Sequence, residues 1–119
     1  MINLETFRTY CLSKTAVTEE MPFGIDTLVY KVGGKIFALA VVESQPFQFN
    51  LKMHPELIQE YRDKYADILP GYHMNNNHWN TVVAGNNKIP LKEIYFMIDH
   101  SYELVKEGLS KKSKEELFK

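Results

Sequence analysis

The chain has little of what marks several protein classes. It contains one cysteine, Cys11, in 119 residues, so no internal disulfide can form and a reducing compartment is expected. The longest apolar run covers residues 36–42, far short of the roughly 20 residues that span a bilayer. The first ten residues lack a basic segment followed by an apolar one, and we expect no secretory signal. These absences predict a cytoplasmic protein.

A strong charge of either sign is also missing. Fourteen Lys and Arg residues against fifteen Asp and Glu residues give a formal net charge of −1. Avid, sequence-blind binding of nucleic acid depends on many cation–phosphate contacts, which this balance does not favour. A local cationic patch is still possible. The hydrophobic content of 45% is enough for a core, and we expect a single domain over residues 1–119.

Helices are predicted in three places, with a fourth segment at the C-terminus. Asn3 can cap a first helix that ends near Ser13, with Phe7 and Cys11 on its apolar stripe. A second helix is expected from Pro55 to the stop at residues 70–71, and a third from Pro90 to Gly108. Residues 110–119 are lysine-rich and predict a solvated tail or a short terminal helix, with a capping box at residues 113–116.

Residues 27–42 predict a β-hairpin, because two β-rich runs flank Gly33 and Gly34, which can adopt the positive φ angles of a tight turn. A two-residue loop places Val32 opposite Lys35, Tyr30 opposite Phe37, and Leu28 opposite Leu39. These pairs form a bulky face. The other face carries smaller groups, which could bind a protein partner or a small ligand if no helix covers them: Val29, Lys31, Ile36, Ala38, Ala40 and Val42.

Further strands are predicted at residues 47–53 and 78–84, with a short one in residues 15–24 that Pro22 interrupts. The order is helix, three or four strands, helix, strand, helix, without the alternation of strand and helix that builds parallel sheets. This order predicts an α+β two-layer sandwich, an antiparallel sheet with helices packed on one face.

Several short segments form a distinctive set over about residues 4–109. The most distinctive is the pattern His-x-Asn-x-x-His-Trp from His73 to Trp79. The others are Met21-Pro22-Phe23-Gly24, Lys31-Val32-Gly33-Gly34-Lys35-Ile36-Phe37, Asn50-Leu51-Lys52, Pro70-Gly71-Tyr72, Asn80-Thr81-Val82 and Ser101-Tyr102-Glu103-Leu104-Val105. Together these segments resemble the MmcQ/YjbR family, and the resemblance implies a CyaY-like (frataxin-like) fold and a presumed DNA-binding role through a double-wing arrangement. Family members often carry lysine just after the position of Asn75, where this chain has Asn76 and Asn77.

A metal site and a catalytic site are both disfavoured by the residue pattern. His73 and His78 have no cysteine near them and only Asp67 as a close carboxylate, whereas zinc normally takes three or four nitrogen, sulfur or oxygen ligands. Cys11 falls on an apolar stripe, and no nucleophile–base motif or glycine-rich phosphate loop is present. We therefore expect a non-enzymatic protein without a cofactor.

The segment 70–82, PGYHMNNNHWNTV, supports two interpretations. In the structural one, asparagines satisfy the backbone of a turn and Trp79 anchors the next strand in the core. In the functional one, DNA contacts a surface of lysines, which bind phosphates, and of amide and imidazole groups, which bind phosphates or base edges. That candidate surface comprises Lys31, Lys35, Lys52, His73, Asn75, Asn76 and His78.

Overall fold

The structure is a computed structural model that describes residues 2–71, 74–75, 77–84 and 88–118. It has the predicted α+β architecture, with a six-stranded, fully antiparallel sheet in the order β1-β2-β3-β4-β6-β5. The helices are α1 (Leu4–Leu12), α2 (Pro55–Lys64), α3 (Leu91–Glu107) and α4 (Lys111–Leu117). The strands are β1 (Val17–Glu20), β2 (Thr27–Val32), β3 (Lys35–Val41), β4 (Gln48–Lys52), β5 (Ile68–Pro70) and β6 (Trp79–Val83).

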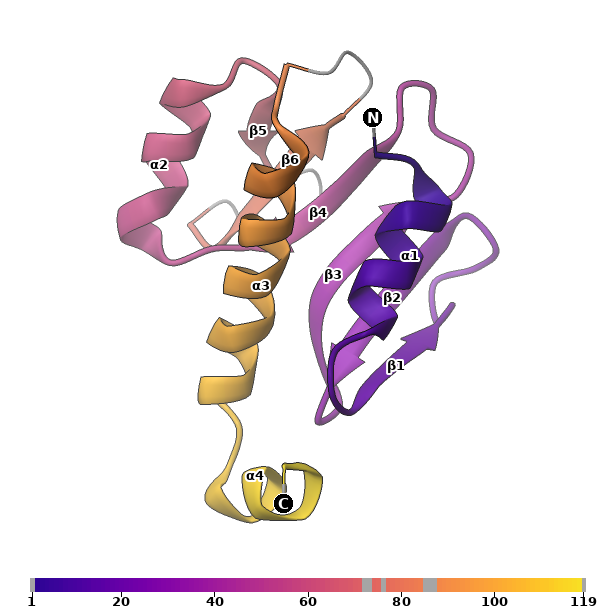
Figure 1. The fold of residues 1–119 in the computed structure, drawn as a ribbon, viewed down its shortest axis with the longest axis vertical. Helices are drawn as coiled ribbons and strands as arrows, with labels where there is room; N and C mark the ends of the chain where they lie inside the picture. The colour runs from indigo at the N-terminus through magenta and orange to yellow at the C-terminus, as the bar shows by residue number, and fades with distance from the viewer. Residues whose placement is uncertain (1, 72–73, 76, 85–87, 119) are drawn as a thin grey trace.

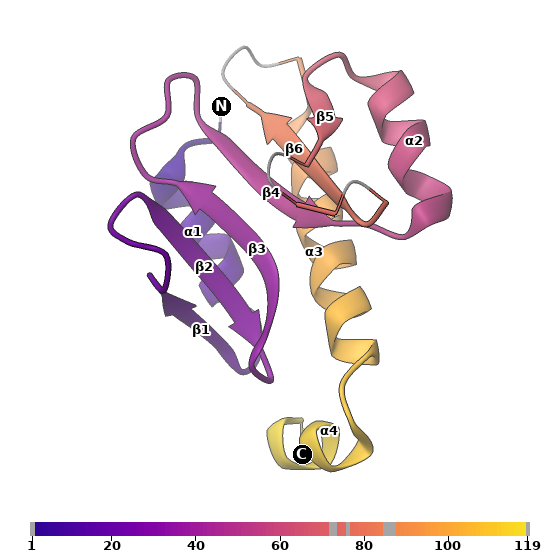
Figure 2. The ribbon, with the colours of Figure 1, turned by 180° about the vertical axis from the view of Figure 1, so that it is seen from behind.

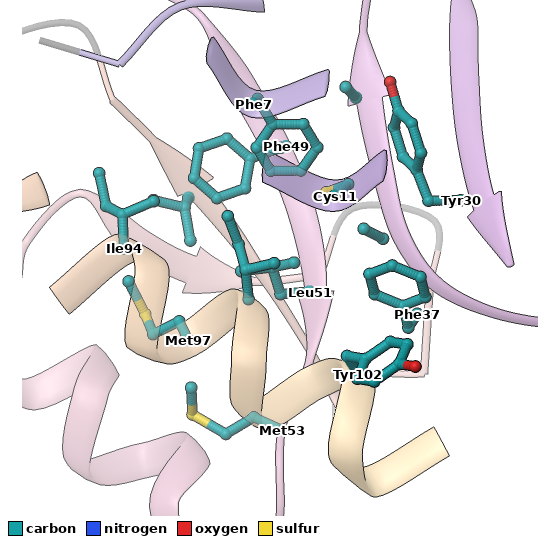
Figure 3. Packing of buried hydrophobic residues seen from close by; sticks show 14 of the residues in the cluster. Phe7, Cys11, Tyr30, Phe37, Phe49, Leu51, Met53, Ile94, Met97 and Tyr102 are labelled. Carbon is teal, nitrogen blue, oxygen red and sulfur yellow. The ribbon is translucent and has the colours of Figure 1, made fainter. Parts of the chain in front are cut away.

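Helices α1 and α3 cover the same face of the sheet, and α2 lies beside β5 and β6 (Figure 1). Seen from behind, the opposite face of the sheet is not covered by a helix (Figure 2). The core between the sheet and the two helices is aromatic: the ring of Phe7 lies 4.6 Å from that of Phe49 and 5.8 Å from that of Tyr30 (Figure 3). Phe37 meets Tyr102 of α3 edge to face at 5.4 Å. Such contacts add stabilisation to the area that the rings bury.

The hairpin forms at Gly33 and Gly34, with φ angles of 59° and 80°, and Val32 pairs with Lys35 as predicted. From Tyr30 onward the predicted register is wrong. Lys31 pairs with Ile36 but Tyr30 pairs with Ala38, so Phe37 is an extra residue in β3. Such a bulge changes which side chains share a face.

The register shift removes the predicted small-residue face. Ala38 and Ala40 belong to the buried core cluster, and Val42 packs partly against it. Val29 is fully buried, although it lies outside that cluster. Of the predicted face, Lys31 and Ile36 remain half-buried.

Two helix boundaries and one inward-facing helix position also differ from the prediction. Helix α2 ends at Lys64, and Ile68, predicted on its apolar stripe, begins the unpredicted edge strand β5. Tyr65 has an extended backbone with a φ of −128°, which stops the helix before the proline. The predicted inward residue Leu91 is 42% exposed at the start of α3. The terminal helix α4 is capped by Ser110 instead of Ser113.

Strands β3 and β4 diverge, and α3 crosses behind the gap between them (Figure 2). Their pairing is limited to three residue pairs, Ala38–Leu51, Leu39–Asn50 and Ala40–Phe49. On its other side, β4 pairs with β6 over its whole length, from Gln48–Val83 to Lys52–Trp79. The sheet is therefore continuous on one side of β4 and split on the other.

Candidate nucleic-acid interface

Two of the predicted lysines lie on the two strands that diverge. Lys35 is the first residue of β3, directly after the hairpin turn, and Lys52 is the last residue of β4. Both line a hollow of about 290 Å³ at the C-terminal end of α3. The remaining lining residues are Ile36, Leu104, Val105 and Gly108. The split thus brings two cations, distant in sequence, to one depression.

Neither of these lysines is neutralised by a neighbour: within the described part of the chain, no ion pair involves Lys35 or Lys52. Lys31 is different. Its ammonium lies 3.4 Å from Glu20, across the β1–β2 pair, and its side chain is 23% exposed. The structure therefore separates the hairpin lysines into one paired and one unpaired cation.

The loop before β6 brings polar groups beside the same strand end. Asn75, Asn77 and His78 are exposed. Asn75 organises the turn, because its Oδ1 accepts from the Asn77 N–H at 2.9 Å and its carbonyl accepts from the N–H groups of His78 and Trp79. The Met53 N–H donates to the His78 carbonyl at 2.9 Å, which ties the loop to the residue after Lys52. The predicted site residues His73 and Asn76 lie outside the described residues.

Trp79 does not anchor the core, contrary to the structural interpretation of the loop. It is half-buried, outside the buried cluster, and pairs with Lys52. The buried residues of β6 are Asn80, Thr81 and Val82. Side chains alternate along a strand, so Asn80 and Val82 share the face opposite to that of Trp79. Gly71 lies against Trp79, since a Cβ at Gly71 would be 2.9 Å from the Trp79 Cβ.

The polar anchor of this region is Asn80, which is 1% exposed and which the sequence analysis missed. Its Oδ1 accepts from the Arg62 Nε at 2.7 Å, and its Nδ2 donates to the Ile58 carbonyl at 3.4 Å. Arg62 also donates to the Trp79 carbonyl at 3.2 Å. These bonds fix α2 on β6. This contact could not be found from the sequence, because an arginine on the polar side of a predicted helix is expected to face solvent.

The position of the terminal lysines was not predicted from the sequence either. Leu109 packs under the hairpin turn, so that a Cβ at Gly33 would be 2.7 Å from the Leu109 Cδ1. Lys111 and Lys112 follow two and three residues later, at the exposed start of α4. The segment predicted as a solvated tail or short helix thus adds cations beside the tip that carries Lys35.

A second hollow, of about 300 Å³, lies between α1 and α3. It has a carboxylate and no cation, so it does not suit an anion. Its lining residues are Glu5, Thr6, Thr9, Tyr10, Ser13 and Tyr95. Tyr10 and Tyr95 stack there with ring centroids 4.0 Å apart. The Tyr10 hydroxyl donates to Asp99 at 2.7 Å, and burial followed by this bond raises the pKa of Tyr10 to about 12.

Other chemistries find little support among the described residues. No group of three His, Cys, Asp or Glu side chains there could hold a metal ion. Cys11 is fully buried, and burial raises the pKa of its thiol far above the ordinary range, which makes it a poor nucleophile. None of the helices in these parts of the chain is long and apolar enough to cross a membrane.

Comparisons with known proteins agree with the fold. The family model YjbR matches residues 12–104. The uncharacterized protein YbdF of Escherichia coli O157:H7 is 38% identical over 109 residues, covering 91% of this chain and 88% of the relative. The uncharacterized protein YjbR of Escherichia coli K12 is 32% identical over 95 residues, which is 79% of each chain.

Solved structures show the same architecture. The crystal structure of Deinococcus radiodurans protein DR2400 superimposes with a TM-score of 0.90 at 33% identity, covering 98% of this chain and 88% of that one. A Pseudomonas syringae protein gives a TM-score of 0.74 at 28% identity, covering 87% of this chain and 99% of that one. The predicted family and fold class are therefore confirmed: the chain belongs to the YjbR family.

Proposed function

We propose that this protein binds nucleic acid weakly and in a salt-sensitive way, without catalysing a reaction, through the surface formed by the hairpin tip, the hollow and the loop before β6. One observation carries the proposal: Lys35 and Lys52, from diverging strands, line the same hollow and have no carboxylate partner in the described residues. Two free ammonium groups can each contact a phosphate. Asn75, Asn77 and His78 supply exposed hydrogen-bonding groups in the loop whose His78 carbonyl accepts from the Met53 N–H, directly after Lys52.

The residues also set the character of this binding. Neither the lining of the hollow nor the described part of the loop contains an arginine, and bidentate reading of guanine is typically done by arginine. Contacts to the backbone should therefore dominate over reading of the sequence. The protein as a whole is slightly acidic, so long-range attraction is small and affinity rests on a few local contacts. A cytoplasmic location, where a single buried thiol stays reduced, is part of the proposal.

The test is a fluorescence-anisotropy titration of a labelled DNA duplex between about 25 and 200 mM salt. We compare the wild type with Lys35→Gln, Lys52→Gln and the double variant, and use Lys92→Gln as the control. Lys92 is exposed at the opposite end of α3. Each hollow lysine that contacts a phosphate should lower the slope of log affinity against log salt by about 0.9. The control should leave the slope unchanged.

Absence of binding by the wild type at the lowest salt would refute the proposal, and so would a double variant that binds like the wild type. Melting curves at each salt concentration show whether the variants are folded. All the substituted lysines are on the surface, where changes usually alter stability by less than about 0.5 kcal/mol.

The alternative is a protein-interaction module, and a different observation favours it. The loop between β1 and β2 holds Phe23 and Ile25 at 68% and 82% exposure, with Met21 at 44%. This loop precedes Thr27 and therefore lies at the other end of β2 from the hairpin tip. A Phe23→Ser/Ile25→Ser variant should bind DNA like the wild type if the lysine surface is the functional one. Loss of DNA binding in this variant, with the lysine variants unaffected, would favour the loop instead.

A further inference from the structure

The split between β3 and β4 occurs at a defined position in the strand register. The last pair before the split is Ala38 with Leu51. Continuing the same antiparallel register by one residue would place Phe37 opposite Lys52. The backbone groups of these two residues do not pair with each other, because a side chain of α3 lies between them.

That side chain is Ser101. Its hydroxyl donates to the Phe37 carbonyl at 2.5 Å and accepts from the Lys52 N–H at 2.9 Å. Ser101 is completely buried, so water does not compete for these bonds. One hydroxyl thus takes the place of one backbone hydrogen bond, satisfying both strands while holding them apart.

The neighbouring residue of α3 acts in the same way just beyond the end of β4. The Nε2 of His100 accepts from the His54 N–H at 3.1 Å. Successive side chains of α3 therefore bond the backbone of Lys52, the last residue of β4, and of His54, two residues further on. The freed N-terminal part of β3 carries Lys35, which lines the hollow opposite Lys52.

From this geometry we infer that Ser101 is a positioning residue of the lysine surface: it sets the gap between β3 and β4 and so the distance between Lys35 and Lys52. The inference rests on the proposed function. Without the hydroxyl, the Lys52 N–H and the Phe37 carbonyl would be unsatisfied buried groups, which cost stability until they find partners. These two groups could then bond to each other, so that β3 and β4 pair over one more residue. The hollow would narrow, and the ammonium groups of Lys35 and Lys52 would approach each other.

A purely structural serine would stabilise the fold without affecting the lysines, and a matched control separates the two roles. Thr81 on β6 donates its hydroxyl to Asn50 of β4 at 2.6 Å, on the continuous side of the same strand. Ser101→Ala deletes the hydroxyl that accepts from the Lys52 N–H of β4. Thr81→Val deletes the hydroxyl that donates to the Asn50 side chain of β4. Ser101→Thr keeps the hydroxyl at the split.

The first measurement uses the wild type and these variants without nucleic acid. Amide hydrogen exchange followed by NMR should show altered protection of the Lys52 N–H in Ser101→Ala, with the Leu51 N–H as the internal reference, and no such change in Thr81→Val. Unchanged protection of Lys52 in a folded Ser101→Ala protein would overturn the inference, whatever the result with DNA. If Ser101→Ala does not fold, Ser101→Cys, which keeps a weak donor of similar size, takes its place.

The second measurement is the salt series with labelled DNA. Ser101→Ala should weaken binding at low salt about as much as Lys52→Gln does, and Ser101→Thr should restore it. In a double-mutant cycle, adding Ser101→Ala to Lys52→Gln should not weaken DNA binding further, because both substitutions act through one contact. Full additivity, or equal weakening by Thr81→Val, would show that Ser101 is only a stabilising residue. If the wild type binds no DNA but Lys52 protection changes in Ser101→Ala, the proposed function fails while the structural role of Ser101 stands.

Discussion

The two sides of strand β4 are built by different means. Toward β6, the strand pairs through its own backbone along all five residues, and α2 reinforces this side through Arg62 and Asn80. Toward β3, it pairs through three residues, after which Ser101 and His100 of α3 take over. One side of the strand is a continuous sheet, and the other is completed by helix side chains.

This difference separates stability from the candidate site. A continuous sheet has few ways to form a hollow, because neighbouring strands lie only about 4.8 Å apart. Where α3 replaces β3, the strands open and an accessible depression appears with Lys35 and Lys52 in its wall. Substitutions on the continuous side should therefore affect mainly stability, and those on the split side should affect the geometry of the lysine surface.

The largest effect is expected on the continuous side, for Asn80→Ala. The substitution removes the acceptor of the Arg62 Nε and leaves space against Met53 and Ile58 in the interior. We expect a loss of about 2 to 4 kcal/mol in the free energy of unfolding, combining the loss of a hydrogen bond from a charged donor with a cavity. Urea denaturation measures it, as a lower midpoint at an unchanged slope.

Asn77→Ala is the matched control for Asn80→Ala. Asn77 is exposed in the loop before β6, and the hydrogen bond found there uses its backbone N–H instead of its side chain. The control should change stability by less than about 0.5 kcal/mol. Equal effects of the two substitutions would mean that the Arg62–Asn80 contact does not hold α2 on the sheet.

A smaller effect is expected at the hairpin tip, on the split side. Gly33 and Gly34 both have left-handed φ angles, but only Gly33 lies against another side chain, that of Leu109. Alanine at either position costs about 1 to 2 kcal/mol in backbone strain. Gly33→Ala should cost about 1 kcal/mol more, because Leu109 must move. Denaturation of the two single variants tests this, and equal losses would show that Leu109 does not hold the tip.

The continuous side was the easier one to predict from sequence. The strict alternation in residues 48–52 predicts which side chains of β4 are buried, and the structure agrees, as it does for the stripe of α3 apart from Leu91. In β6 the pattern is weaker: three consecutive residues are buried, and Trp79, predicted in the core, is half-buried. Strand β5 was missed because its three residues continue the apolar spacing of α2. Only the extended backbone of Tyr65, set by tertiary packing, separates the two elements.

The split side could not be predicted. The bulge at Phe37 depends on how β3 packs on Tyr102, and no local sequence signal marks it. Lys35 and Lys52 were identified by residue type, but their convergence requires Ser101, which the sequence analysis saw as one of two alternative inward positions on a helical stripe. A buried serine in such a stripe is the one available hint, because a buried hydroxyl needs a hydrogen-bond partner. The partner itself is visible only in three dimensions.

The smallest predicted effect is a pH dependence of folding stability that comes from the split side. The Nε2 of His100 accepts a hydrogen bond from the His54 N–H, which requires that this nitrogen carry no proton. Burial, and secondarily the neighbouring His54, lower the pKa of His100 below its ordinary value of 6.5. Between that lowered value and 6.5, the unfolded chain binds more protons than the folded one, so the stability from His100 is complete above 6.5 and decreases as the pH falls.

We expect the denaturation midpoint to fall between about pH 7 and 5, by an amount that His100→Gln reduces. Glutamine has no titrating group and offers an amide oxygen near the position of Nε2. The acidic side chain of Glu19, whose pKa is lowered chiefly by its hydrogen bond with Arg8, contributes its own loss of stability below about pH 4.5 in both proteins. The difference between the two curves above pH 5 therefore isolates His100. If the curves run parallel, the bond from α3 to the His54 N–H does not contribute to stability, and Ser101 alone completes the edge of β4.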